Sequence, residues 1–262
     1  KIPETYLQLE KEDIFKVLES KYSTLGPIWV SHQIEWFNGV YSAFRDHDKF
    51  LIIIFLTKKT LDSYLSSFTK LSYDEFFSNQ TTEIEKFNIS EISNELNIPK
   101  ESTRRKIIEL ENQGVIRRIE KKIIIDRSCF NFFKPINSIK RISTFLATFS
   151  IMCKKEKIVS KKITSEELES IIKNNFSIIW NFYYDMQIPM MVNYKKIFKD
   201  YDTFHIYSAC VVNQHFVSKR MSETYTDRDS FIKSFFTGSK GQGINAMSIS
   251  EITGIPRATV IR

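Results

Sequence analysis

The chain has 262 residues, enough for two domains of ordinary size, and its 42% hydrophobic and 26% charged residues are typical of a globular protein rather than a disordered one. Only 7 Gly and 6 Pro are present, which favours helices joined by short connections over β-sandwiches and barrels. Lys and Arg total 38 against 31 Asp and Glu, and the net charge of +7 suits a polyanionic partner.

The cysteines and the hydropathy pattern indicate the compartment. Cys129, Cys153 and Cys210 are far apart and odd in number, so they fit neither a disulfide framework nor a zinc knuckle. Residues 1–10 contain no signal-peptide core, and the longest strongly apolar run, 50–56, is too short to span a bilayer. We therefore expect a cytoplasmic protein with no membrane partner.

Several buried helices are predicted from apolar patterning. Residues 50–69 are apolar almost all round at their start, which indicates burial, and 204–217 match them. These two aromatic-rich helices can pack on each other or on a second subunit, so a homodimer is possible. A further buried helix is expected at 139–152, and Thr164 with Glu167 forms a capping box for a helix that ends near residue 173.

The clearest local pattern begins at residue 88. Ser90 is suited to cap a short helix whose inner face holds Ile92 and Leu96. Residues 97–99, Asn-Ile-Pro, predict a tight turn, and the proline presets the backbone for a second helix.

The second helix and the segment after it complete the pattern. Gly114 is expected to end the helix, and two short strands at 115–119 and 123–125 follow, joined by a turn at 120–122. The inner face of the helix is predicted to hold Thr103, Ile107 and Leu110.

Helix, tight turn, helix, Gly and hairpin in this order resemble the winged helix-turn-helix superfamily, and the MarR- and ArsR-like bacterial regulators in particular. The resemblance covers about forty residues. It implies that the second helix enters the major groove of DNA and that the hairpin is a wing. The expected DNA-binding residues of the helix are Lys100, Glu101, Ser102, Arg104, Arg105 and Lys106, and those of the wing are Lys121 and Lys122. From Lys100 to Lys122, eight Lys and Arg face four Glu, a net +4.

A second copy of the motif occupies residues 245–262, shifted by 157 without a gap. Its recognition helix is expected to present Arg257, Thr259 and Arg262 to DNA. The rest of that helix and a wing are missing from the sequence, which starts without Met and stops inside the expected helix. We therefore expect a fragment.

The duplication extends upstream of both motifs. Residues 44–50 recur at 198–204 with four of seven positions identical, the pair Phe76-Phe77 recurs as Phe235-Phe236, and Trp36 and Trp180 lie upstream in the two copies. The predicted fold is therefore mainly α, with two repeats that each join an aromatic helical module to a winged helix-turn-helix. The expected segments are a helical module at 1–80, a winged helix-turn-helix at 81–127, a second helical module at 128–236 and a partial helix-turn-helix at 237–262.

Other chemistry-bearing residues have simpler interpretations. The repeated Asp-x-Asp at 46–48 and 200–202 is more economically explained by helix capping, by Asp46 or Asp48 and by Asp200 or Asp202, than by a metal. The four histidines share no ligand spacing, so we expect no metal, and we find no cofactor motif. The aromatic run 180–184 suits a packed core better than a ligand pocket or a base-stacking surface, and the basic run 154–162 suits a solvated face better than a DNA contact.

These patterns favour a sequence-specific transcriptional regulator that binds double-stranded DNA through two helix-turn-helix units per chain. Lys and Arg would bind phosphates, and Arg104, Arg105 and Arg257 would read bases. A plasmid-type replication initiator with tandem winged helices, and a winged-helix scaffold that binds only protein, remain alternatives. No catalytic constellation is visible, so we do not expect an enzyme.

Overall fold

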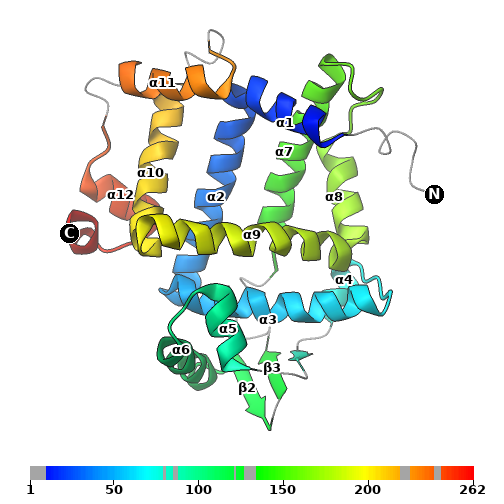
Figure 1. Ribbon diagram of the computed structural model, residues 1–262, viewed down its shortest axis with the longest axis vertical. Helices are drawn as coiled ribbons and strands as arrows, with labels where there is room; N and C mark the ends of the chain where they lie inside the picture. The colour runs from blue at the N-terminus through cyan, green and yellow to red at the C-terminus, as the bar shows by residue number, and fades with distance from the viewer. Residues whose placement is uncertain are drawn as a thin grey trace. The chain divides into compact units, whose positions relative to one another are not determined.

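The computed structural model describes residues 10–78, 81–84, 88–120, 122–126, 134–218, 225–238 and 243–262 (Figure 1). Over these residues the protein is mainly helical, as predicted, and has one three-stranded sheet. None of the described helices is both long enough and apolar enough to cross a membrane. In chain order, the elements are α1 (Lys11–Ser20), α2 (Tyr22–Phe44), α3 (His47–Ser66), α4 (Tyr73–Ser78), β1 (Thr81–Ile84), α5 (Ile89–Leu96), α6 (Lys100–Asn112), β2 (Ile116–Ile119), β3 (Lys122–Asp126), α7 (Ile136–Lys155), α8 (Ser165–Asn174), α9 (Phe176–Phe198), α10 (Tyr201–Ser218), α11 (Arg228–Gly238), α12 (Ala246–Thr253) and α13 (Arg257–Ile261).

The chain divides into two compact units that interleave along the sequence. The first unit comprises Lys1–Asn38, Ile136–Ser170 and His205–Arg262, and the second comprises Gly39–Pro135 and Ile171–Phe204. The four consecutive segments expected from the sequence therefore do not match the compact units. The reason is that long helices pack with elements from the other half of the sequence. Helix α9 belongs to the second unit, with α3, and most of α2 belongs to the first unit, with α10.

The second unit is built on the pair α3 and α9, which lie side by side (Figure 1). Near the start of α3, Asp48 Oδ1 lies 2.7 Å from Lys195 Nζ at the end of α9. Near the other end, Asn181 Nδ2 donates to Asp62 Oδ1 at 2.8 Å. The two helices are therefore antiparallel. Apolar residues 51–56 of α3 are buried all round, as expected of a helix that packs on more than one side.

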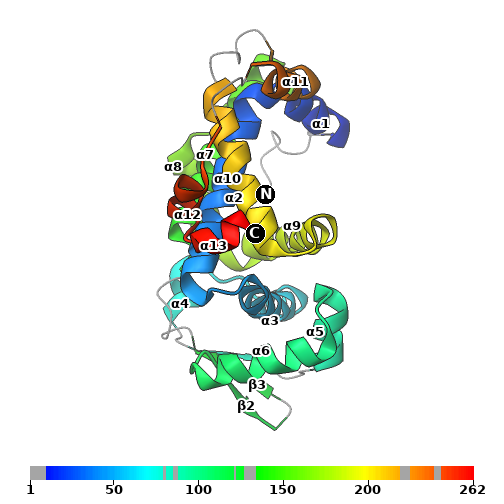
Figure 2. The ribbon, with the colours of Figure 1, turned by 90° about the vertical axis from the view of Figure 1, so that its left-hand side faces the viewer.

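The helix–turn–helix α5–α6 and the sheet pack in the second unit against α3 (Figure 2). The strand order is β1-β3-β2, and both pairs are antiparallel. Strand β1 was not predicted; it alternates exposed and buried residues, with Thr82 and Ile84 buried. The interior of this part is formed by the buried apolar residues Ile84, Ile92, Leu96, Ile98, Ile107, Leu110, Val115, Ile123 and Ile125.

The first unit places α12 against two long helices. Ile34 of α2, Ala209 of α10 and Ile249 of α12 form one buried cluster, with Val260 of α13 packed on it. A separate buried cluster joins α1 and α2 to Cys153 of α7. The sequence predicted both α7 and α10 as buried helices, and both are a few residues longer than expected.

The helix boundaries recur at nearly constant offsets. Helices α8, α9 and α10 begin 154 residues after α1, α2 and α3, and α12 and α13 begin 157 residues after α5 and α6. The rings of Phe44 and Phe50 are 5.9 Å apart at an interplanar angle of 59°, and those of Phe198 and Phe204 are 5.2 Å apart at 58°. The first pair lies on either side of Arg45, between α2 and α3, and the second on either side of Lys199, between α9 and α10. Both Arg45 and Lys199 have positive φ.

Two features used to predict the duplication do not add to this evidence. Under the offset of 154, Trp36 corresponds to Met190 and Trp180 to Gly26, so the two tryptophans are not equivalent positions. The pair Phe76-Phe77 belongs to α4 and Phe235-Phe236 belongs to α11, but the side chains of the second pair lie outside the described residues.

Candidate nucleic-acid interface

Helix α5 has a side-chain cap at its start, and a left-handed residue and a side-chain hydrogen bond fix the turn between α5 and α6. The side chain of Asn88 caps α5 by accepting from the Ser90 backbone N–H at 2.9 Å. The N-cap is therefore Asn88, and the prediction of Ser90 was wrong. Asn97 ends α5 in the left-handed region with φ of 50°. Ser93 Oγ then donates to the Ile98 carbonyl at 2.7 Å, which ties the turn back to α5.

Helix α6 begins directly after Pro99 and presents a polar face to solvent. Its inner face holds Thr103, Ile107 and Leu110, all buried as predicted. Among the residues expected to face DNA, Ser102 is partly exposed, and four are exposed: Lys100, Glu101, Arg104 and Arg105.

Lys106 does not belong to this face. Only 9% of the residue is exposed, and its ammonium contacts the carboxylates of Asp46 and Asp48 at the start of α3. Helical periodicity explains the difference, because residue 106 lies three positions after the buried Thr103 and so shares its face. We therefore remove Lys106 from the predicted DNA-binding set.

The exposed cations of α6 differ in their partners. Arg105 Nε lies 3.7 Å from Glu109 Oε1, and the other oxygen of Glu109 is 2.7 Å from Lys49 Nζ of α3. Because Glu109 is already held by Lys49, the exposed Arg105 has only a long contact with it. Within the described part of the chain, neither Lys100 nor Arg104 has an ion-pair partner.

The hairpin β2–β3 adds further positive charge. Arg118 is held by Glu111 of α6, and hydrogen bonding from Arg118 lowers the pKa of Glu111. Arg117 is exposed and has no ion-pair partner among the described residues, although it was not predicted as a site residue. The signal in the sequence was the basic pair Arg117-Arg118 within the predicted strand 115–119, and in the structure β2 is exposed from Arg117 to Ile119.

Of the two predicted wing residues, the one that the structure describes has an ion-pair partner. Lys122 Nζ lies 2.5 Å from Glu83 Oε1 of β1, so a phosphate must compete with this carboxylate. Both side chains are about half exposed, which makes the pair a weak one. Lys121 lies outside the described residues.

The helix–turn–helix α12–α13 repeats the geometry of α5–α6. Asn245 caps α12 by accepting from Ser248 N–H at 3.0 Å, and Gly254 ends it in the left-handed region. Ser250 Oγ donates to the Ile255 carbonyl at 2.7 Å, the same distance as in the first turn. The residues predicted to bind DNA follow on or just after α13: Arg257 and Arg262 are exposed, and Thr259 is partly exposed.

The remaining candidates have structural partners. Asp46 caps α3 by accepting from Asp48 N–H and Lys49 N–H, and Asp200 accepts from Thr203 N–H at 2.7 Å, as the capping interpretation predicts. Trp180 is buried and stacks on Phe176 and Tyr183. In the described chain, no group of three His, Cys, Asp or Glu side chains is arranged to hold a metal ion.

Comparison with known proteins adds no assignment: no protein-family model matches the chain, and neither a curated protein nor a solved structure matches it. The site is therefore interpreted from its own residues.

Proposed function

We propose that the protein is a sequence-specific transcriptional regulator that binds double-stranded DNA through helix–turn–helix units. The observation that carries the proposal is the exposed row Lys100, Arg104 and Arg105 on a helix whose opposite face is anchored in a hydrophobic core. Lys100 and Arg104 are four positions apart and share one face of α6, and the exposed Arg105 follows Arg104 round the helix, so a groove can contact all three cations. The order of elements, with β1 before α5 and the hairpin β2–β3 after α6, is in keeping with the winged helix resemblance.

The chemistry of the row suggests a division of tasks. An Arg guanidinium can donate two parallel hydrogen bonds to O6 and N7 of guanine, which suits Arg104 and Arg105 for base reading. Lys100 at the first turn of α6 and Arg117 on β2 suit phosphate binding, because a phosphate needs charge more than fixed geometry. Lys122 would join them only by leaving Glu83.

We also propose that the chain consists of two repeats, each with its own helix–turn–helix. The constant helix offsets and the matching caps of α5 and α12 support this proposal. Under the offset of 154, the repeats have exchanged their long helices: α9 packs beside α3, and α2 shares a buried cluster with α10. An ancestral pair of identical chains with swapped helices would have the same pattern.

Reciprocal contacts in the second unit support the repeat proposal independently. His47 Nδ1 lies 3.5 Å from Asp202 Oδ1. In the mirrored pair, burial and then the charge of Asp48 raise the pKa of Tyr201. His47 and Tyr201 are equivalent positions, as are Asp48 and Asp202. The rings of His47 and Tyr201 lie 5.7 Å apart, and each has the Asp of the other repeat in its surroundings, as a twofold relationship requires.

A replication initiator is the second candidate, because two helix–turn–helix units in one chain suit a binding site made of direct repeats. Selection of bound sequences from random DNA, followed by footprinting of the selected site, separates the candidates. A single site with base preferences that Arg104→Ala and Arg105→Ala relax supports a regulator. Protection over iterated repeats supports an initiator, and no selection of any sequence supports a scaffold that binds protein.

A further inference from the structure

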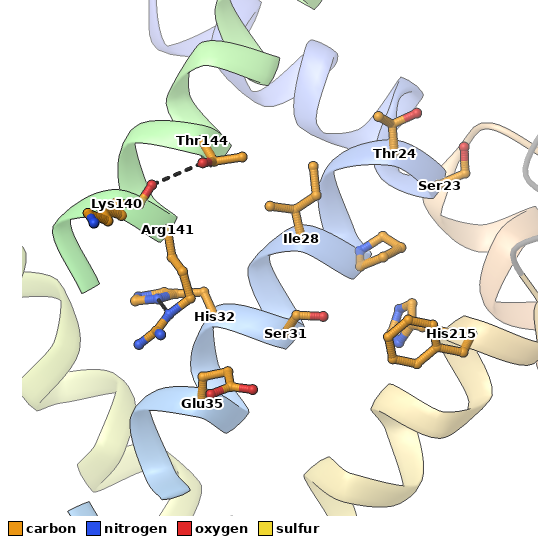
Figure 3. Close-up of a pocket in the computed structure, with 12 residues that line it drawn as sticks. Ser23, Thr24, Ile28, Ser31, His32, Glu35, Lys140, Arg141, Thr144 and His215 are labelled. Atoms are coloured by element: carbon orange, nitrogen blue, oxygen red, sulfur yellow. Dashed lines mark hydrogen bonds between the residues drawn. The ribbon is translucent and has the colours of Figure 1, made fainter. Parts of the chain in front are cut away.

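A cavity in the first unit has no role in the DNA-binding proposal. Its volume is about 610 Å³, within the range of small-molecule sites, and it is lined by residues of α2, α7 and α10 (Figure 3). The predicted DNA-binding residues of α6 belong to the other unit.

One part of the lining is apolar. Pro27 and Ile28 of α2 and Phe216 of α10 contribute hydrocarbon surface, and Phe216 is 67% exposed. Figure 3 shows Ile28 projecting from α2 on the side of the helix that faces the cavity. Covering an apolar ligand with this exposed aromatic ring is favourable in free energy, because the apolar surfaces of ring and ligand are then removed from water.

Another part of the lining is a hydrogen-bonded polar pair, His32 and Arg141. His32 is only 1% exposed, and its Nδ1 accepts a hydrogen bond from Arg141 Nε at 3.4 Å. Burial, and then the charge of Arg141, lower the pKa of His32 to about 4, so the imidazole is neutral at neutral pH and acts as an acceptor. The buried ring thereby orients the guanidinium of Arg141 at the wall, and the two side chains lie together in Figure 3.

The charge of the lining favours an anion. Lys140 and Arg141 of α7 carry two positive charges, and Glu35 of α2 carries one negative charge. A guanidinium has five N–H donors in a planar fork, so Arg141 can hold His32 through Nε and a carboxylate through its other nitrogens. Ser31 and Thr144 also line the cavity, and Thr144 Oγ1 donates to the Lys140 carbonyl at 3.0 Å.

We propose that this cavity is a binding site for a small organic carboxylate with an apolar body, in which Arg141 binds the carboxylate and Ile28, Pro27 and Phe216 cover the hydrocarbon. The proposal concerns binding to the protein alone and stands whether or not the chain binds DNA.

Titration calorimetry of the full chain with octanoate and with 1-octanol tests it, since the two probes share a hydrocarbon body and only one carries charge. We expect octanoate to bind one to one and at least tenfold more tightly than 1-octanol. Arg141→Met should weaken octanoate at least tenfold and leave 1-octanol nearly unchanged. Phe216→Ala should weaken both probes alike, and Glu35→Gln should leave octanoate unchanged or bound more tightly.

Lys155→Ala is the matched control, because it removes one positive charge from an exposed position on the same helix α7. It should leave both affinities unchanged. Equal affinity for the two probes, no one-to-one octanoate binding, or an equal loss in Lys155→Ala and Arg141→Met would overturn the proposal.

Histidine ring resonances of the wild-type protein give a second readout that needs no variant. Octanoate should shift the resonances of His32 and His215, which both line the cavity, and leave those of His47 in the other unit in place. Saturable shifts at His47 without shifts at His32 would place the ligand elsewhere and refute the assignment.

Discussion

Lys106, on the second helix of the first helix–turn–helix, places its ammonium against the carboxylate of Asp46, the residue that caps α3. The side chains are 11% and 24% exposed, so the pair is largely shielded from water. A cation that the sequence predicts to bind DNA therefore anchors α6 to α3.

Lys106→Met keeps the hydrocarbon stem and removes the charge, which leaves the partly buried Asp46 and Asp48 with less compensation. We expect the free energy of unfolding to fall by about 2 kcal/mol, less than for a fully buried pair. Urea denaturation measures this loss, with Lys196→Met, an exposed residue of α9, as the control. If DNA binding by Lys106→Met shows the same drop in salt dependence as Lys100→Ala, Lys106 contacts phosphate and the anchoring role is wrong.

Arg104→Ala and Arg105→Ala should relax base preference at one or two positions of the selected site. The expected loss is about 1–3 kcal/mol of discrimination for each bidentate guanine contact. Competition binding with single-base variants of the site measures the loss. Lys196→Ala removes the same charge from α9 and should retain full discrimination; unchanged preference in both arginine variants would exclude α6 from base reading.

Glu83→Gln should strengthen DNA binding, because it releases Lys122 from its carboxylate partner. An exposed pair contributes up to about 1 kcal/mol, so the gain should be about two- to fivefold at low salt. Fluorescence anisotropy with a labelled duplex measures it. Glu95→Gln, an exposed change on α5, is the control for a general charge effect. An equal gain in both variants would mean that Lys122 is not a DNA contact.

The pKa of His32, about 4, predicts a pH dependence of stability. Between pH 6.5 and 4 the unfolded chain binds a proton at this residue and the native chain does not, so the free energy of unfolding falls as pH falls. The contribution is fully present above pH 6.5, and its loss reaches about 3 kcal/mol near pH 4.

His32→Gln isolates this effect, because glutamine does not titrate. From pH 7 to pH 5 the wild type should lose about 2 kcal/mol more stability than His32→Gln. Denaturant unfolding at the two pH values measures both losses. Equal losses would show that His32 does not carry the pH dependence.

The sequence predicted the helix–turn–helix well because its signals are local. Ile92 and Leu96 mark one helix face, Asn97 and Pro99 mark the turn, and Gly114 follows the second helix with φ of 71°. Strand β1 was missed because four residues carry little pattern by themselves and gain their partner, β3, about forty residues later.

Contacts between residues far apart in the sequence explain the other differences between the prediction and the structure. Nothing near Lys106 in the sequence indicates Asp46, which is 60 residues away and draws the ammonium inward. The packing of α9 beside α3 was not predicted either, because an apolar helix face can be buried equally well against elements of its own half of the sequence or of the other half. Periodicity therefore identifies the faces that are buried, and only the fold identifies what buries them.

The most direct test of the account is the salt dependence of full-chain binding to the selected DNA site, measured by fluorescence anisotropy from 50 to 200 mM KCl, a range in which phosphate contacts are strongly weakened. Four to six phosphate contacts predict a log–log slope of about −4 to −5, and Lys100→Ala and Arg117→Ala should each make it shallower by about 0.9. Absence of binding at 50 mM salt, or a slope near zero, would contradict the proposal that this protein binds DNA.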